Sequence, residues 1–235
     1  MRAYLALSLI IAIGCGDDLN LRDRVCADTS VSSQEAAIYY GNPSTDDRAT
    51  VEIVAVNGNC SGVQIAPGIV LTAAHCGQAL KVWTAFGEAA DATATDIHPG
   101  YNRKSKTADL ALVYLTNPLD TDIATIGIPK LGPAIIQGFG VTEEGTGGYL
   151  YEAEIQIEGF ADGKLYSERS STPKPDACHG DSGGPVYQNG KLVGITAHGI
   201  TKAGCGYGGA YTIPALHMDW IEEETGIVGQ SCPSY

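Results

Sequence analysis

Positive charge, long apolar runs and methionine are all scarce in this sequence. The 235 residues include 14 Lys and Arg against 27 Asp and Glu, which gives a formal net charge of −13. Without a run of Lys or Arg, nucleic-acid binding has no electrostatic basis, and we expect a solvated acidic surface. No segment has the roughly 18 consecutive apolar residues that a membrane-spanning helix needs. Two methionines beside 30 glycines argue against a helical bundle and favour a turn-rich β protein.

The first 14 residues, MRAYLALSLIIAIG, combine one Arg with a short apolar run and predict a signal peptide. Cys15 follows in a stretch that resembles a bacterial lipobox, although Ala12 replaces the usual larger aliphatic residue. Lipid on Cys15 would leave six of the seven cysteines for disulfides. Residues 15–37 are polar and aperiodic, which indicates a lipid-anchored linker or pro-segment. We expect an exported lipoprotein of the bacterial outer membrane or cell surface, or alternatively a secreted protein processed by an ordinary signal peptidase.

From Val51 onward, short apolar or alternating runs are separated by turn residues, as in VEIVAV, IVLTAA, YEAEIQIEG and KLVGITA. These runs predict many short antiparallel strands, arranged as a sandwich or as barrels. The one helical pattern is PALHMDWIEEE, with Pro214 in its first turn and Gly226 at its end. The chain is therefore predicted to be all-β with a C-terminal helix.

Three stretches occur in a characteristic order: LTAAHC ending at Cys76, TADLALVYL around Asp109, and GDSGGPV around Ser182. Together with HPGYN, GFG and GAYT, they resemble the trypsin/chymotrypsin family of serine proteases over residues 38–224. The resemblance implies a two-barrel protease domain that occupies residues 38–235.

The resemblance also implies how that domain is divided. Two antiparallel six-stranded β-barrels are expected, at about 38–128 and about 129–213. A C-terminal helix at about 214–225 is expected to pack on the second barrel and to bury Trp220.

The chemistry explains the residue types in the three stretches. A serine hydroxyl is a poor nucleophile at neutral pH and needs an adjacent base, and imidazole titrates in the working range. His75 provides the imidazole, and Asp109 provides a carboxylate to fix its tautomer. By resemblance, the N–H groups of Gly180 and Ser182 form the oxyanion hole. The catalytic residues implied are His75, Asp109 and Ser182, which hydrolyse peptide bonds through an acyl-enzyme without a cofactor or metal.

In the family, an acid at the position of Asp181 pairs with an α-amino group that cleavage exposes. The stretch AAIYYGNPS resembles that activation site, with Ile38 as the new N-terminus and Gly41 in the small-residue position, although two tyrosines between them depart from the pattern. Ala37 is not Arg or Lys, so self-cleavage is not expected and an activating protease is implied. Two alternatives stay open: the protein remains a zymogen, or Ile38 is an ordinary strand residue with an intact amide.

The resemblance also implies disulfide pairs and a substrate pocket. Cys60 would pair with Cys76 and Cys178 with Cys205, which leaves Cys26 for Cys232. Asp176 matches the pocket acid that selects Arg and Lys, with Gly199 and Gly209 as wall glycines, and a solvated loop acid is the alternative reading of Asp176. His198 stands where the family usually has tryptophan and His179 lies on the pocket rim, and rim packing is the expected role of each.

We therefore predict a serine endopeptidase of the trypsin type, made as a zymogen and acting after Arg or Lys. Its expected partners are protein or peptide substrates and an activating protease, and it is expected to be a monomer that binds no nucleic acid. The principal alternative is a catalytically silent protease-like binding or scaffold protein. A serine hydrolase that acts on esters is a further alternative.

Overall fold

A computed structural model describes residues 38–145 and 147–228 of the chain. No helix within these residues is long and apolar enough to cross a membrane. The predicted signal peptide, the lipidation site Cys15 and the proposed pair Cys26–Cys232 lie outside the described residues.

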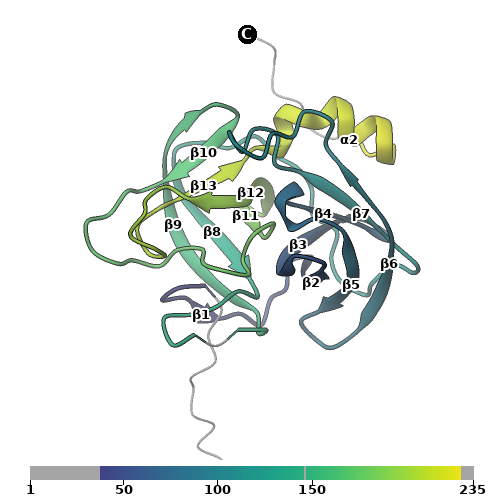
Figure 1. Cartoon of the computed structure of the whole chain (residues 1–235), viewed down its shortest axis with the longest axis horizontal. Helices are drawn as coiled ribbons and strands as arrows, with labels where there is room; N and C mark the ends of the chain where they lie inside the picture. The colour runs from purple at the N-terminus through teal and green to yellow at the C-terminus, as the bar shows by residue number, and fades with distance from the viewer. Residues whose placement is uncertain (1–37, 146, 229–235) are drawn as a thin grey trace, which may run out of the picture. The chain divides into compact units, whose positions relative to one another are not determined.

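The first barrel is a closed ring of antiparallel strands in the order β2-β3-β4-β7-β6-β5 (Figure 1). In β2, every second residue, Val51, Ile53 and Ala55, is buried, as expected for a strand with one face on a core. The strands are β2 (Thr50–Ala55), β3 (Gly58–Ala66), β4 (Ile69–Thr72), β5 (Ala79–Thr84), β6 (Ala89–Ile97) and β7 (Ala111–Leu115).

The second barrel is a ring in the order β9-β10-β13-β12-β11-β8, closed by the pairing of β8 with β9. In β9, the buried Ile155 and Ile157 alternate with the exposed Glu154, Gln156 and Glu158. Its strands are β8 (Gly132–Gly138), β9 (Tyr151–Ala161), β10 (Lys164–Ser167), β11 (Pro185–Gln188), β12 (Lys191–Gly199) and β13 (Gly209–Thr212). Two six-stranded antiparallel barrels confirm the predicted fold class.

The segment after Ile38 joins the second barrel, not the first. Strand β1 (Asn42–Pro43) pairs with β9, where Asn42 lies opposite Glu152 and Pro43 opposite Tyr151. The expectation that the first barrel begins at about residue 38 was therefore wrong.

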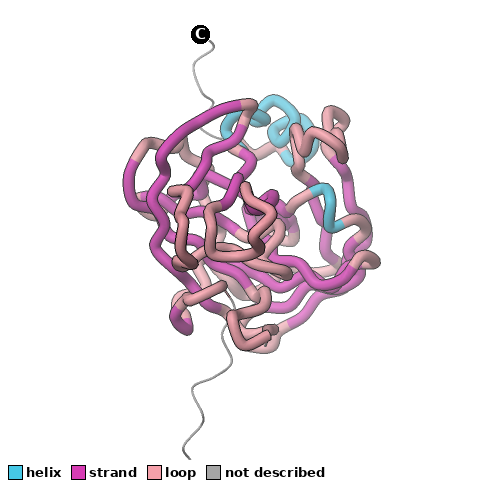
Figure 2. Tube along the Cα trace, turned by 60° about the vertical axis from the view of Figure 1, so that its left-hand side comes forward, coloured by secondary structure: helices cyan, strands magenta, loops and turns pink. Residues whose placement is uncertain are grey.

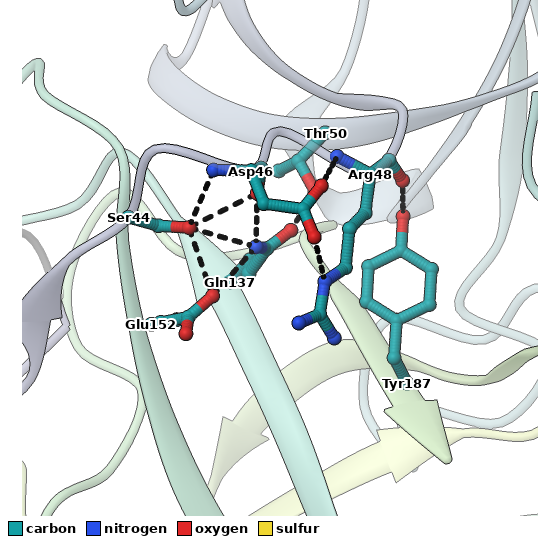
Figure 3. Close-up of polar contacts among 7 residues, drawn as sticks. All are labelled: Ser44, Asp46, Arg48, Thr50, Gln137, Glu152 and Tyr187. Carbon is teal, nitrogen blue, oxygen red and sulfur yellow. Dashed lines mark hydrogen bonds and ion pairs between the residues drawn. The ribbon is translucent and has the colours of Figure 1, made fainter. Parts of the chain in front are cut away.

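A buried glutamine explains this placement (Figure 3). Gln137 of β8 is fully buried, and its amide nitrogen donates to the Asp46 carbonyl at 2.6 Å and to the Glu152 carboxylate at 2.9 Å. Its amide oxygen accepts from the Thr50 hydroxyl at 2.6 Å. A buried amide needs such partners, and all of them except Glu152 of β9 lie in residues 44–50. The chain is thus held on the second barrel before it enters the first.

The C-terminal helical segment spans both barrels. The 3₁₀ turn η2 (Pro214–His217) contacts β12, and α2 (Met218–Thr225) follows it and ends at Gly226. The ring of Trp220 in α2 lies 4.7 Å from that of His98, which follows β6. Trp220 is buried as expected, and η2 packs on the second barrel, whereas Trp220 of α2 contacts His98 of the first. Figure 2 shows how little of the described chain is helical.

The two barrels are joined by Ser61 of β3, which is fully buried. Its N–H donates to the Ser182 carbonyl at 2.8 Å, and its hydroxyl donates to the Gly180 carbonyl at 3.0 Å. The same hydroxyl accepts from the Phe139 N–H at 2.9 Å. A strand of the first barrel thereby holds the loop of the second barrel that carries Ser182.

Candidate active site

His75 is oriented by a buried carboxylate. It lies in the 3₁₀ turn η1 (Ala74–Cys76) just after β4, and Asp109 immediately precedes Leu110 and β7. The His75 N–H donates to Asp109 Oδ1 at 2.9 Å, and His75 Nδ1 lies 2.8 Å from Asp109 Oδ2. Asp109 is 0% exposed. Because an ionised carboxylate can only accept, Nδ1 carries the proton, and Nε2 of a neutral His75 is left as the basic nitrogen.

Ser182 lies next to this pair. Its carbonyl is 3.7 Å from Sγ of Cys76, the neighbour of His75. Among the described residues, no hydrogen bond joins the Ser182 hydroxyl to His75, as is common in the absence of substrate. The structure thus brings the three predicted residues to one junction between the barrels.

The turn around Ser182 depends on glycine at two positions. Gly180 has φ 96° and Gly183 has φ 82°, a region that L-residues rarely adopt. A Cβ on Gly180 would lie 2.6 Å from Gly140 Cα, and a Cβ on Gly183 would lie 2.9 Å from the Ala73 nitrogen. Both positions therefore exclude side chains for steric as well as conformational reasons.

The amides of this turn fall into two groups. Those of Asp181, Gly183 and Gly184 donate to protein carbonyls at 2.8–3.1 Å. Those of Gly180 and Ser182 have no acceptor within residues 38–145 and 147–228. Both residues are only partly buried, so these two N–H groups are available to an oxygen that enters from outside.

A cavity of about 330 Å³ opens beside these groups. Its lining includes Gly180 and Ser182, the predicted wall residues Gly199 and Gly209, and the two rim residues His179 and His198. The two wall glycines differ in their surroundings. A Cβ on Gly199 would have only the Gly208 carbonyl near it, at 3.9 Å, whereas one on Gly209 would lie 2.6 Å from the Tyr211 hydroxyl. Gly199 thus leaves space for a ligand, and Gly209 leaves space for Tyr211.

Asp176 lies behind the Tyr211 wall of this cavity and is 3% exposed. Its carboxylate accepts from the N–H groups of Ala177 and Gly208, both at 2.9 Å, and from the Tyr211 hydroxyl at 3.2 Å. Burial raises the pKa of Asp176 and these donors oppose the rise. The alternative that Asp176 is a solvated loop acid was wrong, since the side chain is buried and hydrogen-bonded.

Asp181 is fully buried beneath the Ser182 turn. Its carboxylate accepts from the N–H groups of Gly140 and Cys178, each at 2.8 Å, and from that of Ile38. Burial raises the pKa of Asp181 to about 7. Ile38 is itself 0% exposed, so its nitrogen and the carboxylate already face one another.

Two disulfides support the site, at the pairs that the resemblance implied. Cys60–Cys76 fixes the turn that carries His75, and Cys178–Cys205 ties the Ser182 loop to the opposite wall of the cavity. In the part of the chain that the structure describes, no cluster of three or more His, Cys, Asp or Glu could hold a metal ion.

Sequence reasoning missed Ser61, Gly140 and Tyr211 as parts of the site. Gly140 and Tyr211 stand inside the recognised stretches GFG and GAYT. Their place in these motifs is the only sequence feature that indicates a role in the site. Ser61 carries no motif, and only the meeting of the two barrels reveals it.

A family model described as "Trypsin" matches residues 38–221. The chain is 32% identical over 202 residues to "Trypsin" of Sarcophaga bullata, which covers 72% of this chain and 80% of the relative. It is 34% identical over 202 residues to "Brachyurin" of Leptuca pugilator, which covers 72% and 88%.

Solved structures show the same likeness. Mouse neuropsin, described as a serine protease, matches with a TM-score of 0.70 and 25% identity over 80% of this chain and 99% of that one. HL collagenase matches with a TM-score of 0.69 and 21% identity over 81% and 100%, a likeness that concerns the fold alone. The two relatives named above are an insect and a crustacean protein and give no support to a bacterial lipoprotein.

Proposed function

Because the chain belongs to the trypsin family of serine endopeptidases, we propose that it cleaves peptide bonds after Arg or Lys, once cleavage before Ile38 has activated it. The observation that carries the proposal is the paired His75 and Asp109 beside the Ser182 turn. Export, lipid on Cys15 and a monomeric state remain predictions.

Catalysis assigns one role to each member of the site. The Ser182 oxygen attacks the substrate carbonyl carbon while His75 Nε2 takes the hydroxyl proton. His75 then gives that proton to the departing amine as the C–N bond breaks, which leaves an acyl-enzyme. Water then attacks the acyl-enzyme while His75 Nε2 takes its proton, and His75 returns that proton to the departing Ser182 oxygen. Asp109 keeps the imidazole oriented and stabilises its charged form.

The N–H groups of Gly180 and Ser182, which have no acceptor among the described residues, support an oxyanion hole. During attack, negative charge builds up on the substrate carbonyl oxygen. Two fixed N–H donors meet that charge without reorganisation, which lowers the barrier selectively. The turn glycines are needed because they let the backbone hold these donors in place.

Asp176 supports the proposed preference for basic side chains. A buried carboxylate is costly without a positive partner, and neutral donors offset the cost only in part. The raised pKa of Asp176 reflects that remaining cost. An Arg or Lys side chain that enters past Gly199 would supply the missing charge.

Cleavage before Ile38 is expected to switch the activity on. We would replace the five residues before Ile38 with an enteropeptidase recognition sequence and assay peptide substrates with Arg, Lys, Leu or Phe before the scissile bond. Cleaved protein should hydrolyse the Arg and Lys substrates, and uncleaved protein should be at least about a hundredfold slower, because the buried Asp181 carboxylate gains a counter-charge that stabilises the turn only when cleavage creates the Ile38 ammonium. No hydrolysis in either state would favour a silent binding protein. Equal activity in both states would show that the protein does not need cleavage before Ile38 to be active.

The charge state of Asp181 gives a second prediction. In the uncleaved chain its pKa is about 7, so between about pH 4 and pH 7 the folded chain holds a proton that the unfolded chain has released. The stability of the uncleaved protein should therefore fall as pH rises through this range, by up to about 4 kcal/mol. Cleavage places an ammonium at Ile38, which should lower the pKa of Asp181 and abolish this loss.

Urea unfolding at pH 5 and pH 8 measures the effect. Asp181→Asn is the matched control, because it keeps the shape of the side chain and cannot ionise. The difference between the two uncleaved proteins isolates Asp181 from other titrating groups. An identical pH dependence in the uncleaved chain and in Asp181→Asn would contradict the prediction.

A further inference from the structure

Two histidines outside the catalytic residues are in direct contact. His98 opens the Asp109 loop, which we define as residues 98–109, and His217 is the last residue of η2. His217 Nδ1 lies 3.1 Å from His98 Nε2, and the two rings pack edge to face with centroids 4.6 Å apart. The Trp220 ring of α2 packs on His98 from another side. The C-terminal helical segment therefore contacts His98, the first residue of the Asp109 loop, from two sides.

His98 also closes the base of that loop. Its N–H donates at 3.0 Å to the carbonyl of Leu110, the residue after Asp109. Its carbonyl accepts from the Tyr101 N–H at 2.9 Å. Because Leu110 follows Asp109 directly in the chain, a displacement of His98 would be transmitted to Asp109 through the hydrogen bond to Leu110.

The hydrogen bonds fix the tautomers of both rings. The Gly100 N–H lies 3.0 Å from His98 Nδ1 and can only donate, so His98 Nδ1 is unprotonated. Neutral His98 then carries its proton on Nε2 and donates it to His217 Nδ1, which must also be unprotonated. A proton added to His98 Nδ1 would point at the Gly100 N–H, and one added to His217 Nδ1 would point at the His98 Nε2–H. The pair can gain a proton only by breaking one of these two hydrogen bonds.

The charged groups around the pair do not compensate for that loss. Asp96 of β6 faces Tyr114 of β7. The other charged groups on the neighbouring elements are four carboxylates of α2 and three cations of the Asp109 loop: Asp219, Glu222, Glu223, Glu224, Arg103, Lys104 and Lys106. His217 also stands at the N-terminus of α2, where the helix dipole disfavours a cation. Burial together with His98 lowers the pKa of His217 to about 4, and burial lowers that of His98.

We propose that His98 and His217 are positioning residues, which hold the base of the Asp109 loop against the C-terminal helix as a neutral pair and release it when acid protonates them. The inference rests on the proposed function, in which Asp109 orients His75. A lowered folded pKa makes this contact fully stabilising above about pH 6.5, and the stabilisation is lost as pH falls toward 4.

Two measurements test the pair. The first is a histidine ¹⁵N NMR titration of the Ser182→Ala protein, which needs no activity. His98 should be protonated only at Nε2 and His217 should lack a proton at Nδ1. The amide signals of residues 101–109 should shift as the pair titrates below pH 6, and not in His217→Phe, which keeps an aromatic ring but cannot accept. A proton on His98 Nδ1, or loop amides that ignore the titration, would overturn the proposal whatever the activity of the enzyme.

The second measurement is the pH profile of kcat/KM for the cleaved enzyme. One essential proton gives an acid limb of unit slope, and protonation of the pair adds a second, so the slope of log kcat/KM should approach two only below about pH 4. His217→Phe should return the slope to one and lower kcat about threefold at pH 8 with KM unchanged. Glu223→Gln, an exposed change on the same helix, should keep the native profile. Unit slope in the native enzyme would contradict the inference, whereas an inactive enzyme with the expected NMR result would count against the proposed function alone.

Discussion

Replacement of Ser182 by alanine is expected to lower kcat by about six orders of magnitude in the cleaved protein, with little change in KM. The Ser182 hydroxyl forms the acyl-enzyme in this mechanism, and the neighbouring N–H donors cannot replace it. Residual hydrolysis, on the order of a thousandfold above the reaction in water, should persist, because the amides of Gly180 and Ser182 remain. Steady-state hydrolysis of an Arg substrate measures both quantities.

The fold should survive this change. The backbone contacts of Ser182, from its carbonyl to Ser61 and Cys76, do not involve the hydroxyl. Ser171→Ala, at an exposed serine, is the matched control and should leave kcat unchanged. If Ser182→Ala retained more than about a hundredth of the native kcat with an intact fold, another nucleophile would be responsible.

Replacement of Asp176 by asparagine is expected to remove the preference for Arg and Lys. The change keeps the size of the side chain and deletes the buried charge, so kcat/KM for Arg and Lys substrates should fall about 10³- to 10⁵-fold. Hydrolysis of Leu or Phe substrates should change by much less, because their side chains have no charge to pair. The ratio of kcat/KM between Arg and Leu substrates is the measurement.

Glu168→Gln separates pocket chemistry from general charge. Glu168 is paired with Lys174 on the partly exposed loop that leads to Asp176, so its loss changes the net charge equally without touching the buried carboxylate. It should leave the ratio unchanged. A uniform loss for all substrates in Asp176→Asn would show that the residue supports the pocket structurally and does not select the substrate.

The fold could be predicted because its signals are local. Alternation in β9 follows from one buried face, and the order of the three motifs indicated two barrels. The pairing of β1 with β9 could not be predicted, because a two-residue strand has no periodicity and depends on the distant amide of Gln137. The contact of α2 with the first barrel was also missed, since an apolar helix face does not identify the surface that it covers.

The site was predictable to the extent that its residues stand in motifs. His75, Asp109 and Ser182 were named from sequence, and the structure brings them to one junction. Ser61 could not be named, because its role arises only where two barrels meet. The contact of His98 with His217 was equally hidden, since it joins residues far apart in the chain and its tautomers follow from hydrogen-bond geometry.

The central claim is that a single serine between the barrels becomes nucleophilic when the chain is cut before Ile38. The most direct measurement is intact-mass analysis with peptide mapping, after incubation with an arginine-directed phosphonate that bonds covalently to activated serines. The account predicts one adduct per cleaved chain, located on Ser182, and none on uncleaved protein. An unlabelled cleaved chain, or an adduct on a different residue, would contradict it.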